Sequence, residues 1–175
     1  AVGCRNMMLI TLGTGVGGGI IVDGRIVSGL GGAGGEPGHS LLVLDGEPCT
    51  CGRRGCWEVY ASATALIRQG REAAAAHPTS LLNRYPELTG RDVFDAADAG
   101  DEAAQAVRRI TDLVNILSPE MVLIGGGISR QGERLLRPIR RYVAANCFGG
   151  ENRPQPVIQA AQLGNEAGII GAAAL

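Results

Sequence analysis

A cluster of three cysteines and one histidine places the strongest constraint on how this sequence can fold. Cys49, Cys51 and Cys56 stand within eight positions in the run CTCGRRGC, and His39 precedes Cys49 by ten positions. Three thiolates and one imidazole make a complete tetrahedral set for a structural zinc ion, and the glycines of the run permit tight turns that bring the sulfur atoms together. The alternative, three ordinary thiols in a loop, accounts poorly for their crowding in so polar a segment. The cluster therefore predicts a zinc-binding loop.

The size and composition of the chain fit one globular unit. Its 175 residues suit one domain, or one lobe of a larger protein, and 45% of them are hydrophobic and 19% charged. The 28 glycines are clustered without a Gly-X-Y period, so they indicate tight turns rather than collagen. The basic residues are all arginine, which excludes Schiff-base lysine chemistry and a lysine-tipped phosphate loop.

The charge and the termini bear on partners and location. A net charge of −1 gives no field that would gather nucleic acid or anionic membranes. No apolar run approaches the ~20 residues of a membrane span, and the start AVGCRNMM lacks the features of a signal peptide. We therefore expect a soluble, cytoplasmic protein without membrane or nucleic-acid partners. Cys4 and Cys147 lie apart from the cluster and are expected to be buried apolar residues.

The pattern of apolar runs, glycines and prolines predicts a mixed α/β fold. Asp23-Gly24 between two short apolar runs is typical of a two-residue hairpin turn. Pro78 ends a helical stretch, Thr89 and Asp92 resemble a helix-capping pair, and Pro138 must kink its helix or lie in the first turn. The expected strands are 7–12, 20–22, 25–27, 121–124 and 157–161, and the expected helices are 57–76, 93–99, 101–117, one around 135–143, and 165–175.

Two glycine-rich loops are candidates for binding an anionic ligand. The first, over 13–19, follows a buried strand, and its N–H groups beside Thr14 can form a nest for an anion. These residues fit a plain glycine-rich hairpin equally well. The second loop, Gly125 to Gly127, lies between a buried strand and a helix, where a ligand could approach the backbone closely.

The motifs LGTGVGGGIIVDG, GEPGH, C-x-C-G-x-x-G-C-W-E and VLIGGGIS, in this order, resemble the ROK family of sugar kinases and related repressors, and the cysteine motif resembles its bacterial glucokinase branch. The resemblance covers essentially the whole chain. It implies a ribonuclease-H-like, actin-type ATPase fold with a mixed sheet flanked by helices, in which two lobes close over sugar and ATP.

The resemblance also implies roles for individual residues. The implied zinc ligands are His39, Cys49, Cys51 and Cys56. The implied sugar contacts, in a zinc loop over 36–58, are Glu36, His39 and Glu58. The phosphate loop maps onto Gly13, Thr14, Gly15 and Gly17, and the adenosine-side glycines are Gly125, Gly126 and Gly127.

Two departures from the family pattern shape the expectations. Pro37 replaces the usual aliphatic residue and should hold Glu36 in an extended conformation. The sequence also lacks the family's first phosphate motif, Asp-x-Gly-Gly-Thr, and its Asn-Asp pair with the catalytic aspartate. We therefore expect residues 1–175 to be the C-terminal lobe of a longer kinase, with the aspartate base upstream of Ala1 and the fragment inactive alone.

The implied activity is that of an ATP-dependent hexose kinase, a glycolytic glucokinase that uses ATP with Mg²⁺ and a structural zinc. Helices of small residues with apolar stripes lead us to expect a homodimer. The alternatives are the effector-binding part of a sugar-responsive repressor and a zinc-stabilised interaction module without a sugar site. The sequence leaves open which hexose is used and whether ATP or polyphosphate is the donor.

Overall fold

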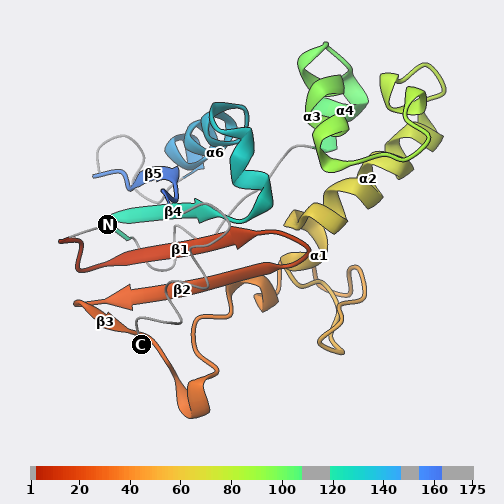
Figure 1. Cartoon of the computed structure of the whole chain (residues 1–175). Coiled ribbons are helices and arrows are strands. Elements are labelled where there is room, and N and C mark those ends of the chain that lie inside the picture. Colours follow the sequence, from red (N-terminus) through yellow and green to blue (C-terminus); the bar gives the residue numbers. More distant parts are fainter. Residues whose placement is uncertain (1–2, 108–118, 147–153, 163–175) are drawn as a thin grey trace.

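A mixed sheet forms the centre of the protein, whose computed structural model describes residues 3–107, 119–146 and 154–162 (Figure 1). Within these residues the sheet has five strands in the order β3-β2-β1-β4-β5. β1 runs antiparallel to β2 and β2 to β3, whereas β4 is parallel to β1 and β5 is parallel to β4. The predicted mixed α/β class is confirmed. The strands are β1 (Met7–Leu12), β2 (Val16–Val22), β3 (Arg25–Ile26), β4 (Met121–Gly125) and β5 (Val157–Ala160).

The β2–β3 hairpin turns at the predicted Asp23-Gly24 pair, where both residues have positive φ, 50° and 77°. The loop before β2 is shorter than expected. It ends at Gly15, and Gly17 to Gly19 pair with β1 inside the ladder. The reason is tertiary packing, since a Cβ at Gly18 would overlap the ring of Pro37. This glycine serves a close approach rather than a turn.

One face of the sheet carries the buried core at β1 and β4. Alternate residues of β1 are buried, and the register places Met8 beside Val122 and Ile10 beside Ile124 on that face. Leu135 and Leu136 of helix α6 (Glu133–Asn146) belong to the same buried cluster. This is the core that the apolar runs before the glycine loops predict.

The expected helix over 57–76 is two helices, α1 (Glu58–Ala61) and α2 (Ala63–Ala76). They are separated at Ser62, whose backbone is extended and whose hydroxyl accepts the N–H of Ala65 at 3.1 Å as the cap of α2. α2 ends before Pro78 as predicted.

The capping prediction for the next helix is confirmed. α3 (Gly90–Asp98) begins after a complete capping box formed by Thr89 and Asp92. α4 (Glu102–Val107) follows. The rest of the helix expected to 117, the helix 165–175 and Cys147 lie outside the described residues. Short 3-10 turns complete the description: η1 (Leu30–Gly32), η2 (Pro37–His39), η3 (Leu81–Arg84) and η4 (Gly127–Gln131).

Pro138 lies in the interior of α6, beyond its first turn, so the Arg134 carbonyl loses its helical donor. Of the two alternatives expected for Pro138, the first-turn position is excluded and the kink stays a prediction. The expectation that Cys4 is buried is wrong, because Cys4 lies before β1 begins, outside the sheet, and is only half-buried.

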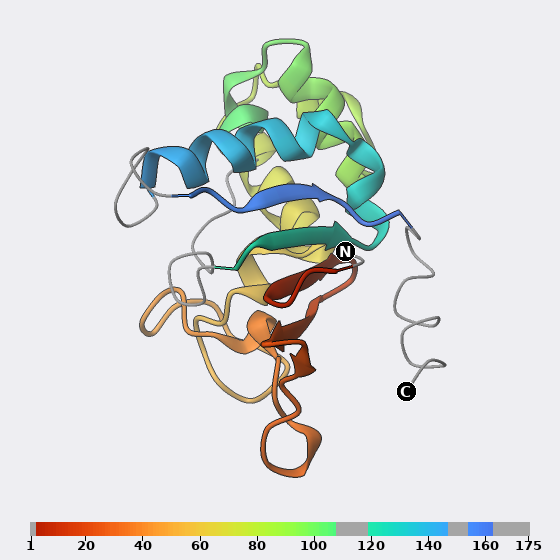
Figure 2. The ribbon, with the colours of Figure 1, turned by 90° about the vertical axis from the view of Figure 1, so that its left-hand side faces the viewer.

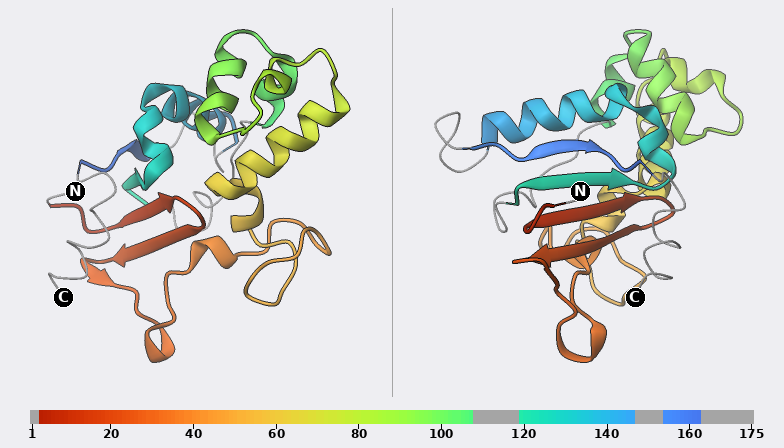
Figure 3. Two further views of the ribbon diagram at one scale, coloured as in Figure 1. Left: turned by 45° about the vertical axis from the view of Figure 1, so that its right-hand side comes forward. Right: turned by 60° about the vertical axis from the view of Figure 1, so that its left-hand side comes forward.

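Helices α2, α3 and α4 gather beyond the end of the sheet where β1 turns into β2, and α6 runs beside β5 (Figures 1, 2 and 3). Arg134 of α6 links this helix to α3, because its guanidinium forms ion pairs of 2.7 Å with Asp95 and 2.6 Å with Asp98 of α3. None of the helices in the described ranges is long and apolar enough to cross a membrane.

Candidate functional site

The four predicted metal ligands form one cluster. Their ligand atoms all lie within 4.8 Å of one another. His39 Nδ1 is 3.7 Å from Cys49 Sγ, and the sulfur atoms of Cys51 and Cys56 are 3.6 Å apart. Zinc–sulfur bonds of ~2.3 Å in a tetrahedron place the sulfur atoms about 3.8 Å apart. The donor set and its spacing therefore fit a zinc ion, which these four residues would hold.

The loop that carries the cysteines folds back on itself. Isolated bridges pair Leu41 with Cys56 and Pro48 with Arg54. Gly55 has a φ of 75°, and a Cβ there would overlap the carbonyl oxygen of Val43. The hydroxyl of Tyr60 accepts the Glu47 N–H at 2.8 Å and ties the loop to α1. The loop thus has a defined shape that brings its sulfur atoms together.

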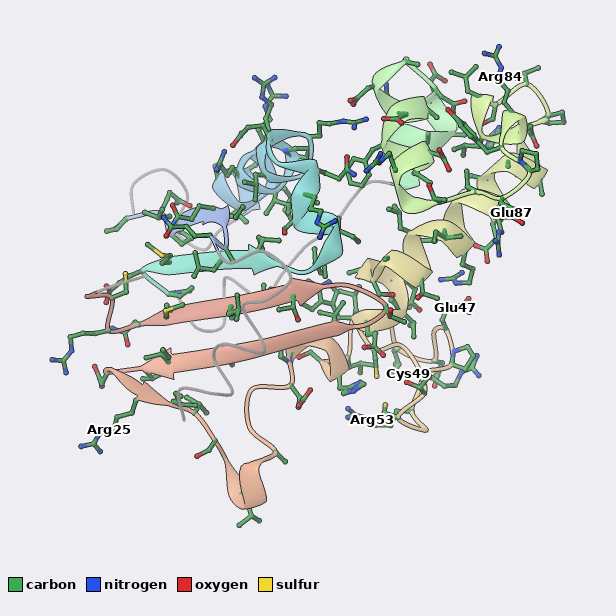
Figure 4. All side chains as sticks on the ribbon, in the orientation of Figure 1. Arg25, Glu47, Cys49, Arg53, Arg84 and Glu87 are labelled. Atoms are coloured by element: carbon green, nitrogen blue, oxygen red, sulfur yellow. The ribbon has the colours of Figure 1, made fainter. Side chains whose placement is uncertain are left out.

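Arg53 lies beside the cysteine cluster (Figure 4) and affects the ionisation of Cys51. Its backbone N–H and its guanidinium lower the pKa of Cys51 to about 6, whereas burial raises the pKa of Cys56 to about 11. The guanidinium also donates to the His39 carbonyl at 2.8 Å. Three thiolates around a divalent zinc ion carry a net charge of −1, so a cation at this position balances the site. Sequence reasoning missed Arg53, although an arginine between the cysteines is a usable signal.

The two glycine loops lie side by side at one edge of the sheet. β1 and β4 are parallel, with Thr11 paired to Gly125, so the loops that follow them start at the same edge. Gly126 has a φ of 80°, and a Cβ there would come within 2.5 Å of the Leu12 carbonyl oxygen. The carboxyl ends of parallel strands are where open α/β sheets bind ligands. The fold therefore brings together the loops that were predicted separately.

The first glycine loop is held by the start of α2. The Ala63 N–H donates to the Gly13 carbonyl at 2.7 Å, and the Thr64 hydroxyl donates to the Thr14 carbonyl at 2.9 Å. The N–H groups of Thr14 and Gly15 find no acceptor among the described residues, and Thr14 is exposed. Two consecutive donors at an exposed turn fit the predicted anion nest. Gly17, predicted to belong to this loop, lies in the β2 ladder instead.

Glu58 stands between the metal cluster and the glycine loop. Its Oε2 accepts the Val16 N–H at 2.9 Å, and its Oε1 lies 3.9 Å from Cys49 Sγ. A Cβ at Gly15 would overlap Oε2, so the carboxylate fills the space beside that glycine. The predicted sugar contact therefore adjoins the predicted phosphate loop.

The E-P-G-H turn, residues 36–39, lies against β2, and no hydrogen bond among the described residues joins it to Glu58. Glu36 is exposed, and its carboxylate has no hydrogen bond to the described residues. Its backbone, at φ −94° and ψ 68°, is not extended as expected, because its carbonyl turns to accept the His39 N–H at 3.2 Å. His39 directs Nδ1 to the cysteines, which leaves Nε2 on the opposite side of its ring. Thus His39 joins the cluster and Glu36 does not.

The sheet order, the paired glycine loops and the cysteine cluster together define one lobe of an actin-type ATPase fold. A model of the ROK family matches residues 1–175, and the chain belongs to that family.

Named relatives include kinases and a repressor. A glucokinase of Halalkalibacterium halodurans is 43% identical over 97% of this chain, and a xylose repressor of Bacillus spizizenii is 27% identical over 82% of it. The crystal structure of a ROK family glucokinase from Streptomyces griseus, in complex with glucose and AMPPNP, matches 98% of this chain with a TM-score of 0.86 and 39% identity. The chain spans 55% of the first protein, 37% of the repressor and 60% of the solved chain.

Proposed function

We propose that this chain forms the sugar-binding and zinc-binding lobe of an ATP-dependent hexose kinase, a glucokinase that converts glucose and ATP to glucose 6-phosphate and ADP. The observation that carries the proposal is the position of Glu58, whose carboxylate contacts the Val16 N–H beside the glycine loop and lies near the metal cluster. Transfer of a phosphoryl group to a sugar hydroxyl requires the two sites to adjoin. The glucokinases among the relatives support the same assignment.

Each group of residues then has a defined task. Glu36, His39 through Nε2, and Glu58 through Oε1 hydrogen-bond the sugar hydroxyls and orient the sugar. The N–H groups of Thr14 and Gly15 bind phosphate oxygens of ATP, and Gly125 to Gly127 flank the adenosine. The Mg²⁺ that accompanies ATP supplies charge neutralisation at the phosphates. Zinc at the cysteine cluster would fix the shape of the loop rather than act on the substrate.

We place the aspartate that accepts the sugar proton outside residues 1–175, in the part of the relatives' length that this chain does not match. The described aspartates have other partners or positions. Asp92 caps α3, Asp95 and Asp98 pair with Arg134, and Asp101 accepts the Ser80 hydroxyl. Asp23 lies in the hairpin turn, and Asp45 lies exposed in a turn of the cysteine loop; both have positive φ. In this proposal the 175-residue chain binds zinc but does not phosphorylate sugar when it is alone.

The test is ADP formation by the full-length protein with glucose, mannose and N-acetylmannosamine, with ATP and then with polyphosphate as the donor. We expect ATP-dependent turnover that is fastest with glucose. Absence of sugar-dependent ADP formation by metal-loaded protein would overturn the proposal. Sequence-specific DNA binding relieved by sugar, without turnover, would instead identify the repressor, which the lower identity to the xylose repressor makes the weaker candidate.

The zinc, the assembly and the location complete the proposal. We expect one zinc ion per chain by elemental analysis, at the four clustered ligands. We expect a homodimer, since large apolar side chains such as Leu30 and Leu44 are 97% and 77% exposed. We place the protein in the cytoplasm. Light scattering that gives the mass of one chain at tens of micromolar would contradict the dimer.

A further inference from the structure

We propose that Thr64 is a positioning residue that sets the orientation of the phosphate-binding N–H groups in the glycine loop. The inference deepens the proposed kinase function and rests on it. Thr64 lies in the first turn of α2, and its hydroxyl donates to the Thr14 carbonyl at 2.9 Å. The two residues are 50 positions apart in the chain, so the contact belongs to the tertiary fold.

Because the peptide bond is planar, the hydrogen bond from Thr64 to the Thr14 carbonyl also fixes the direction of the next N–H group, that of Gly15. In a trans peptide the C=O and the following N–H point in opposite directions. Because the Thr14 carbonyl points to Thr64, the Gly15 N–H points to the opposite side of the loop. The Gly13 carbonyl likewise points to the Ala63 N–H, which directs the Thr14 N–H the same way. Both are the donors that find no acceptor among the described residues.

The third peptide of the loop is fixed from the other side. The Val16 N–H donates to Glu58 Oε2 at 2.9 Å, and the Gly15 carbonyl accepts the Gly13 N–H at 3.0 Å. Three consecutive peptide planes are therefore held, by Ala63, Thr64 and Glu58. The backbone N–H of Ala63 holds the first plane, and Glu58, which is also a proposed sugar contact, holds the third. Only the second plane depends on a side chain with no other proposed task, that of Thr64.

The Ala63 N–H and the Thr64 hydroxyl, at the start of α2, are not needed for hydrogen bonds within the helix. The first N–H groups of a helix have no partner inside it, and Ser62 caps α2 by accepting the Ala65 N–H. Ala63 N–H is thus free to reach the loop, and Thr64 is exposed, so its hydroxyl is not needed to satisfy a buried group. Replacement of Thr64 should leave α2 intact and release only the Thr14–Gly15 peptide.

The test compares Thr64→Val and Thr64→Ala with Thr64→Ser in the full-length, metal-loaded protein. Calorimetry with the ATP analogue AMPPNP gives the nucleotide affinity without turnover, and glucose titration gives the sugar affinity. We expect Thr64→Val and Thr64→Ala to weaken AMPPNP binding about three- to ten-fold, with the same rise in KM for ATP, because one neutral hydrogen bond is lost. Glucose affinity should not change, and Thr64→Ser should restore nucleotide affinity.

Thr79→Val is the matched control, since Thr79 is an exposed threonine in the loop between α2 and η3, remote from the glycine loop. It should not change AMPPNP binding. Folded Thr64→Val and Thr64→Ala proteins with wild-type AMPPNP affinity would overturn the inference while the kinase function stands. A wild-type protein that binds AMPPNP but forms no ADP with any sugar would overturn the function alone. Absence of AMPPNP binding in the wild type would overturn both.

Discussion

Replacement of Gly15 by alanine tests how the sugar side and the phosphate side of the site are joined. A Cβ at Gly15 would overlap Glu58 Oε2 and lie 3.1 Å from Cδ of the same carboxylate. Gly15 has no positive φ, so alanine brings no backbone strain. The carboxylate is the end of a flexible side chain and can move away. Gly15→Ala is therefore expected to break the hydrogen bond from the Val16 N–H to Glu58 rather than to leave a steric clash.

A hydrogen bond to a charged group contributes about 1.5–3 kcal/mol, and Glu58 is half-buried, so solvent screens it only in part. Displacement of Glu58 also removes its contact with the sugar. We therefore expect Gly15→Ala to lower kcat/KM for glucose roughly 10- to 150-fold. The assay is steady-state kinetics of the full-length protein, together with calorimetric titration of glucose. Gly13→Ala is the matched control, because a Cβ there would meet nothing within 4 Å and Gly13 has no positive φ.

A double-mutant cycle separates this mechanism from a general loss of loop structure. In a Glu58→Ala background the Cβ at Gly15 no longer displaces a carboxylate, so Gly15→Ala should add little further loss. Additive losses from the two substitutions, or equal losses from Gly13→Ala and Gly15→Ala, would refute the reasoning.

Three further outcomes are expected. Cys51→Ser should lower the bound zinc measured by elemental analysis and the melting temperature, as chelation of the wild type does, whereas Cys4→Ser should change neither. Burial alone would raise the pKa of the Asp101 carboxyl, but the backbone N–H donors of Ala104 and Leu81, with the Ser80 hydroxyl, lower it below its ordinary value. Asp101 then stabilises the fold above about pH 4 and this contribution disappears as the pH falls through its folded pKa, so the difference in denaturant midpoint between wild type and Asp101→Asn should vanish in acid. Arg134→Met should cost at most about 1 kcal/mol in denaturant unfolding, less in high salt, because both of its ion pairs are partly exposed; a larger, salt-independent loss would contradict this.

The sequence predicted those parts of the fold that depend on local chemistry. The apolar run before Gly13 gives β1, Asp23-Gly24 gives the hairpin turn, and Thr89 with Asp92 gives the cap of α3. The metal cluster was also predictable, because the ligand types and their spacing define it.

The sequence could not predict features that depend on distant packing. Gly18 looks like a loop residue until the ring of Pro37 is found against it. The break at Ser62 is hidden in a helix-forming stretch, because only the contact with the glycine loop reveals where α2 must begin. Thr64 gave no signal, since its partner is far away in the chain.

The loop between His39 and Cys56 buries little of its apolar surface. Leu41 to Leu44 form four consecutive large apolar residues, and all four are exposed. A cross-link that closes a loop of about 15 residues restricts the unfolded chain and so stabilises the folded state by about 3 kcal/mol. The small apolar burial in this loop does not provide a comparable stabilisation. Until zinc binds, a newly made chain would present this uncharged apolar run in an unstructured segment, and exposed runs of this kind promote aggregation. Zinc supply during synthesis should therefore decide how much of the protein stays in solution.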